Sequence, residues 1–108
     1  MQRKYSIIFL LFLAFLNLIF FWHISLIATI IFIALAIWKH KISPLKNEFS
    51  FWFVIFVGGG LVEVVFVNYI KAWSYAVQDI FEIPLYMPFL WAFIGITLIS
   101  FYLEFKRL

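Results

Sequence analysis

Residues 51–70 read FWFVIFVGGGLVEVVFVNYI, and the only Asp, Glu, Lys or Arg among them is Glu63. A helix rises about 1.5 Å per residue, so this run is about 30 Å long, the thickness of a bilayer's hydrocarbon core. The stretch therefore predicts a transmembrane helix that carries one carboxyl group inside the apolar span.

A second apolar run, residues 5–38, is too long for one transmembrane helix. It has 34 residues and would extend about 51 Å as a single helix. We therefore predict two helices, 5–22 and 24–40, joined at the Trp-His-Ile-Ser sequence of residues 22–25; a bend near Asn17 is the alternative. The run also exceeds the roughly 7–15 residues of a signal-peptide core, so we expect it to be retained.

The rest of the chain supplies one more span. Residues 39–50 are polar and contain Pro44, which predicts a loop. Residues 86–105 are apolar again and follow Pro84. Together these runs predict an all-α integral membrane protein of one domain, residues 1–108, with four transmembrane helices over 5–22, 24–40, 51–70 and 86–105.

The composition agrees with insertion into a bilayer. Hydrophobic residues make up 68% of the chain and charged residues 12%, and the mean hydropathy is +1.14. A soluble domain of this size would have too few charges to wet its surface. The net charge of +3 does not indicate nucleic-acid binding, because the basic residues flank the apolar runs. The chain has no cysteine, which excludes disulfides and thiolate sites.

The basic residues also predict an orientation. With the N-terminus in the cytoplasm, seven of the eight Lys and Arg residues face the cytoplasm: Arg3, Lys4, Lys39, Lys41, Lys46, Lys106 and Arg107. Lys71 alone lies outside. The positive-inside rule therefore predicts a multi-pass protein of the cell (inner) membrane with both termini cytoplasmic.

Residues 71–83 are too polar to span and have the spacing of an amphipathic helix. Apolar residues fall at helical intervals, namely Trp73, Ala76, Val77, Ile80 and Phe81. Polar residues fall between them, namely Lys71, Ser74, Gln78, Asp79 and Glu82. We predict a short helix in the outer interface; the alternative is that helix 51–70 continues out of the membrane.

Glu63 is the leading candidate for a functional residue. A carboxylate at that depth is costly unless it is protonated, paired or hydrated, so we expect a neutral Glu63 in contact with helices 1 or 2. By depth it can meet a set of polar residues in the outer half of the bundle: Asn17, Thr29, Asn68 and His23. The alternative is one structural hydrogen bond between helices.

Other features add less to the predicted site. Outer-face candidates are Trp73, Tyr75, Asp79 and Glu82, although the aromatic belt of a membrane protein also explains the two aromatic residues. Gly58–Gly60 precede Glu63 and indicate either close helix packing or the close approach of a ligand. His23 and His40 fall at opposite membrane faces without a metal-binding spacing, so we expect no metal and no cofactor.

Residues 60–91 contain Glu63, then Trp73-x-Tyr75, then Ile83-Pro84-x-x-x-Pro88-x-x-Trp91. This order resembles that of the polytopic carotenoid hydratases and, more loosely, that of the three-helix lycopene cyclase domains. The resemblance covers about a third of the chain and implies an isoprenoid-modifying membrane protein. At the acid pair of the cyclases, Pro-x-Glu-Glu, this chain has Pro84-Leu-Tyr-Met.

Three classes of function remain open. The first is a noncatalytic subunit or oligomer-forming membrane protein with a polar pocket around Glu63. The second is a small oligomeric proton-coupled transporter or channel, and the third is an isoprenoid- or lipid-modifying enzyme or half-enzyme. All three place the chain in a lipid bilayer, as a homo-oligomer or in a larger membrane complex, because four short helices enclose little space.

The predicted orientation can be tested with reporter fusions. A reporter that works only in the cytoplasm should be active when fused after Leu108, and a reporter that works only outside should be inactive there. This placement makes seven of the eight basic residues obey the positive-inside rule. A fusion in the 71–83 segment is the matched control and should report the outer side. A C-terminal fusion that reports the outer side would mean an odd number of spans.

Overall fold

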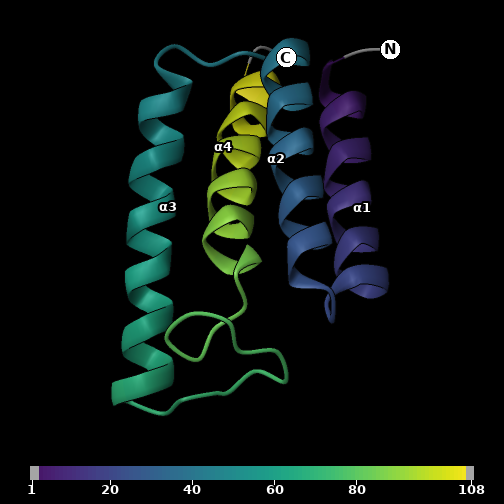
Figure 1. The fold of residues 1–108 in the computed structure, drawn as a ribbon. Coiled ribbons are helices and arrows are strands. Elements are labelled where there is room, and N and C mark those ends of the chain that lie inside the picture. The colour runs from purple at the N-terminus through teal and green to yellow at the C-terminus, as the bar shows by residue number, and fades with distance from the viewer. Residues whose placement is uncertain (1–2, 107–108) are drawn as a thin grey trace.

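Four helices in an up-and-down arrangement make up the protein (Figure 1). The computed structural model describes residues 3–106, with side chains from residue 5 onward. Its elements are α1 (Arg3–Phe21), α2 (Ser25–Ile42), α3 (Glu48–Val64), the π-helical turn η1 (Val65–Tyr69) and α4 (Tyr86–Lys106). The side chains of Arg3, Lys4 and Arg107, which the orientation argument counts, lie outside the described residues.

The four predicted helices are present. Three of them are long and apolar enough to cross a membrane: Ser25–Ile42, Glu48–Tyr69 and Tyr86–Lys106. The fourth, α1, is a shorter apolar helix. The turn between α1 and α2 falls at residues 22–24, where the Ile24 amide donates to the Phe21 carbonyl at 3.0 Å, rather than at Asn17.

The helices form a bent row rather than a closed bundle, in the order α1, α2, α4, α3 (Figure 1). The last helix of the chain is the central one, because α4 contacts α1, α2 and α3. In the core, the centroid of the Phe32 ring lies 6.2 Å from the centroid of the Phe93 ring and 6.3 Å from that of the Tyr86 ring. The helix ends at the N- and C-termini lie at the same end of the molecule as the α2–α3 loop.

Two glycines set the short distance between α3 and α4. A Cβ atom on Gly59 would lie 2.5 Å from the Trp91 ring, and one on Gly95 would lie 2.6 Å from the Ile55 side chain. Both contacts are shorter than any real Cβ contact, so a larger residue would push the helices apart. Small residues at helix interfaces have this role in membranes.

The amphipathic helix predicted for residues 71–83 is wrong. Residues 70–85 are irregular, with an isolated bridge between Ile80 and Ile83. Backbone φ angles are positive at Lys71, Phe81 and Glu82, a conformation that no helix contains. The helical spacing of apolar residues was real, but the aromatic side chains turn back toward α3 and hold the segment in a loop.

A buried ion pair joins α2 to the start of α3. Lys39 is fully buried, and its Nζ lies 2.6 Å from Oε1 of Glu48, which is 6% exposed. The same oxygen accepts the Leu45 amide at 2.9 Å. At Ser43, the carbonyl accepts the Ser100 hydroxyl at 3.3 Å. These bonds fix the α2–α3 loop on the end of α4. Lys39 is therefore a buried structural residue as well as one of the basic residues near the membrane edge.

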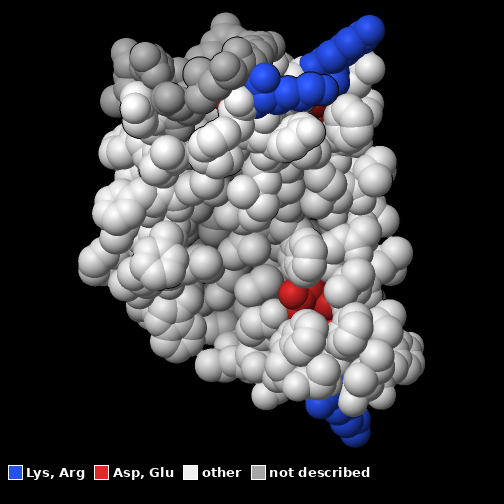
Figure 2. All heavy atoms as spheres, turned by 180° about the vertical axis from the view of Figure 1, so that it is seen from behind, with Lys and Arg blue, Asp and Glu red and all other residues white. Residues whose placement is uncertain are grey.

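Charged groups are confined mainly to the two ends of the molecule. Figure 2 shows Lys and Arg at both ends, with a broad uncharged band between them that one acidic patch interrupts. The exposed side chains of the helices are mostly large and apolar. Such a surface matches the apolar interior and polar edges of a bilayer.

The Lys39–Glu48 pair should contribute strongly to stability. We expect Lys39→Met to lower the free energy of unfolding by about 3 kcal/mol or more, because it leaves a buried carboxylate without its cation. Lys41→Met, at the exposed neighbour of the same helix, is the control and should have little effect. Thermal melts followed by circular dichroism in detergent measure the difference; equal melting temperatures would contradict it.

Candidate functional site

The Glu63 cluster consists of Glu63, Trp73, Tyr75 and Trp91, and it joins α3, the 70–85 loop and α4. Trp73 Nε1 and the Tyr75 hydroxyl both donate to Oε2 of Glu63, at 3.1 and 2.6 Å. Trp91 Nε1 donates to the other oxygen, Oε1, at 2.9 Å. Glu63 itself is only 4% exposed. Both carboxyl oxygens therefore have donor partners in a nearly closed environment.

The π-helical turn η1 brings the loop back to Glu63. It begins two residues after Glu63 and is capped by the Ile70 amide, which donates to the Val65 carbonyl at 3.0 Å. Beyond it, the Ala72 amide donates to the Phe66 carbonyl at 2.8 Å. The Trp73 ring then stacks on the Phe66 ring, with 5.2 Å between centroids and 6° between planes. The chain therefore reverses just after η1 and returns close to the carboxyl group of Glu63.

Asn68 holds the far side of the same loop. Its Nδ2 donates to the Val64 carbonyl at 3.1 Å and to the Phe81 carbonyl at 2.7 Å. The Phe81 carbonyl belongs to a stretch with positive φ, where the loop's own backbone makes few regular bonds. Asn68 thus acts as a second tie between the end of α3 and the loop.

Gly59 gives Trp91 its place beside Glu63. Gly59 lies one helical turn before Glu63 on the same face of α3. Its missing side chain leaves the space that the Trp91 ring occupies. Gly58, its neighbour, has open space where a Cβ would be. Of the two interpretations of the glycines, the structure shows close packing, and that packing places a donor on the carboxyl group.

The Tyr75 phenol is held in its donating form. Burial, followed by the hydrogen bond to Glu63, raises the pKa of Tyr75 above its usual range. A phenol is already protonated at neutral pH at its ordinary pKa of about 10; the raised pKa of Tyr75 means that it also keeps this proton in more alkaline solution, and its hydroxyl donates a hydrogen bond to the carboxyl group. The three partners are neutral groups, and each points a hydrogen at the acid.

The structure does not bring the other predicted pocket residues to Glu63. Asn17 is buried and donates to the Ala28 carbonyl at 3.1 Å, tying α1 to α2. The Thr29 hydroxyl donates to the Ser25 carbonyl within α2 at 2.7 Å. His23 is exposed and lies against the Trp22 ring. The expected contact of Glu63 with helices 1 or 2 is replaced by contacts with the loop and α4, because α4 stands between α3 and those helices.

The outer-face residues divide in the same way. Trp73 and Tyr75 point inward to Glu63, whereas Glu82 is exposed. Asp79 accepts the Leu85 amide on Oδ2 at 3.0 Å, just before α4 begins. Trp91 is the one residue of the Glu63 cluster that the candidate site residues predicted from sequence do not include. The pattern of residues 60–91 did contain it, together with Glu63, Trp73 and Tyr75.

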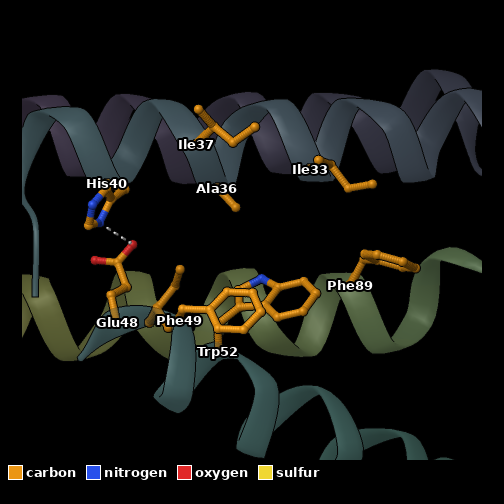
Figure 3. A pocket seen from close by; sticks show the side chains of 9 residues that line it. Ile33, Ala36, Ile37, His40, Glu48, Phe49, Trp52 and Phe89 are labelled. Carbon is orange, nitrogen blue, oxygen red and sulfur yellow. Dashed lines mark ion pairs between the residues drawn. The ribbon is translucent and has the colours of Figure 1, made fainter.

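An apolar groove with a volume of about 390 Å³ lies between α2 and α3, with α4 behind it (Figure 3). Ile33 and Ala36 of α2 face the rings of Trp52 and Phe89 across it. At one end it is closed by polar residues, where His40 Nδ1 lies 3.3 Å from Oε2 of Glu48. The groove is separate from the Glu63 cluster, because no member of that cluster lines it.

Among the described residues, no group of three His, Asp or Glu side chains gathers as metal ligands would. The chain matches no family model, no curated protein and no solved structure in comparisons with known proteins. The fold and the site thus define a class by their own geometry. It is a small α-helical membrane protein with several spans and a buried, hydrogen-bonded Glu63.

The two neighbouring glycines provide a matched test of the Glu63 cluster. Gly59→Ala should displace the Trp91 ring and destabilise the protein by about 1–3 kcal/mol, as overpacking in a closed interface does. Gly58→Ala adds the same methyl group into open space, so its effect should stay within about 1 kcal/mol. Tryptophan fluorescence and thermal melts compare the two; similar behaviour of both variants would contradict the packing.

Proposed function

We propose that this chain is a noncatalytic membrane protein that works by contact within the bilayer, as a homo-oligomer or as a subunit of a larger membrane complex. The observation that carries the proposal is that the buried charged groups all bond to other parts of the protein. Glu63 and Glu48, the buried acids of the described chain, both accept hydrogen bonds that hold loops in place. Lys39, the buried base, is paired with Glu48.

This use of charge leaves little for chemistry on a substrate. A catalytic acid needs access to the reacting group, within hydrogen-bond reach. The carboxyl group of Glu63 is 4% exposed, and both of its oxygens already accept bonds. Its geometry is that of a group that orders the end of α3 and the loop. The protonation state of Glu63 stays a prediction.

The open row of helices favours assembly. In a closed four-helix bundle each helix has two neighbours, but α3 has its main helix contacts with α4 alone. Its exposed side chains include Phe53, Val54 and Leu61. A second copy or a larger partner would cover this exposed face of α3, which is not part of the groove, without any change in the described chain.

One observation favours an alternative function, that of an isoprenoid- or lipid-modifying enzyme. Four of the residues that carry the resemblance to carotenoid hydratases meet at one carboxyl group in this structure: Glu63, Trp73, Tyr75 and Trp91. A carboxyl group among aromatic rings is also a setting in which a cationic carbon centre can be stabilised. The alternative requires the loop to open and admit a substrate.

Glu63→Gln separates these functions. Glutamine replaces one carboxyl oxygen by an NH₂ group, which would then face an indole or phenol donor instead of accepting its hydrogen bond. The free energy of unfolding should therefore fall by about 1–3 kcal/mol. Under our proposal the assembled mass in detergent, measured by native mass spectrometry, stays the same. Glu82→Gln, at an exposed acid, is the control.

The contrary results are equally specific. A wild-type particle of one 12.9 kDa chain under mild detergent conditions would contradict the assembly. An extracted isoprenoid that wild-type protein converts and a stable Glu63→Gln protein does not convert would establish the enzyme instead.

A further inference from the structure

The groove between α2 and α3 opens sideways, toward the medium that surrounds the helices. Its walls are aliphatic on α2 and aromatic on α3, with Phe89 of α4 as part of the floor (Figure 3). Around the apolar spans of this protein that medium is lipid. The volume of about 390 Å³ falls within the usual range for small-molecule sites, roughly 300–1,000 Å³.

The groove is about two thirds as long as one leaflet of hydrocarbon is thick. It runs along α2 from Ile33 to His40, a distance of about 10 Å at 1.5 Å per residue. One leaflet contributes about 15 Å of hydrocarbon. A chain that enters from the leaflet on the side of the α2–α3 loop would therefore lie in the groove over most of the depth of that leaflet.

The end of the groove at that leaflet is polar and basic. His40 lines the groove and its side chain is 57% exposed, while the charge of Glu48 is balanced by buried Lys39. Lys41 and Lys46 are exposed next to it in the chain. Clustered basic residues at a membrane surface attract anionic headgroups.

We propose that this groove is a binding site for one anionic phospholipid of the leaflet on the α2–α3 loop side. One acyl chain lies between α2 and α3 against Trp52, and the phosphate lies at His40, within reach of the two exposed lysines. The lipid fills the groove between α2 and α3, and its phosphate offsets part of the positive charge of Lys41 and Lys46.

The surroundings and the charge of the groove favour a lipid over a protein helix. The groove opens toward hydrocarbon, and the exposed Lys41 and Lys46 follow its His40 end in the chain. The site does not rest on the proposed assembly, since lipid binding and particle mass are measured separately.

The test is native mass spectrometry of the detergent-solubilised full chain, titrated with dioleoyl phosphatidylglycerol or dioleoyl phosphatidylcholine. Wild type should bind one phosphatidylglycerol in preference to phosphatidylcholine. Ala36→Phe places a ring in the groove and should weaken that binding by about tenfold or more. Ala34→Phe makes the same change on an exposed face of the same helix and should bind as wild type does.

A second variant tests where the lipid phosphate binds. Replacing Lys41 and Lys46 by Gln together should reduce the preference for phosphatidylglycerol by about tenfold while phosphatidylcholine binds as before. An unchanged preference would overturn the assignment of the phosphate. Equal lipid binding by the Ala36→Phe and Ala34→Phe variants would overturn the assignment of the acyl chain to the groove. A lowered particle mass of Ala36→Phe with unchanged lipid binding would also overturn it, and would assign the groove to a second copy.

A measurement on the unaltered protein covers the case in which Ala36→Phe does not fold. A phosphatidylglycerol with a photoreactive group at the middle of one chain should crosslink to residues 33–52, where α2 and α3 face the groove. Crosslinks spread evenly over all four helices would show ordinary solvation by lipid and would overturn the proposal.

Discussion

The arrangement of the end of this protein that carries the 70–85 loop depends on one requirement, that a carboxyl group buried in an apolar span must have hydrogen-bond donors. Hydrocarbon offers none, so an unsatisfied Glu63 would cost several kcal/mol. Two indole N–H groups and one phenol supply them. To do so, the chain turns back through η1, and α4 approaches α3 closely enough for Trp91 to reach the acid across Gly59. The shape of the loop and the position of the Trp91 side chain thus both serve the same carboxyl group.

A second buried acid has the corresponding position at the other end of α3. Glu48 takes the Lys39 ammonium and the Leu45 amide, and so fixes the loop between α2 and α3. With both ends of α3 held by acids and its middle packed on α4, nothing draws it onto α2. The groove is the space that remains, and its polar end is built from the same Glu48 that holds the loop. A structural ion pair and a lipid site therefore share one residue.

The predictions from sequence succeeded where one physical rule dominates and failed where several compete. Apolar length alone predicted the spans, because hydrocarbon admits a backbone only when its polar groups are bonded internally. Residues 71–83 had helical spacing, yet they form a loop. There, the side chains of Trp73 and Tyr75 both donate to the buried Glu63 carboxyl group, and the loop conformation is the one that brings them to it. Local periodicity contains no information about an acceptor that lies ten residues earlier in the chain.

What the sequence determined by itself is the apolar character of the helices, their number and the presence of one carboxyl group, that of Glu63, inside an apolar helix; it left the α1–α2 turn open between residues 22–25 and Asn17. These depend on composition and on the spacing of neighbours, which a sequence records directly. The tertiary structure decided the partners. Depth alone allowed Asn17 as a partner for Glu63, and Lys39 was counted as an edge residue, but α4 separates α3 from α1, and folding buries Lys39 against Glu48. Which faces meet depends on helix order and rotation in space, and these are set by packing of the whole chain.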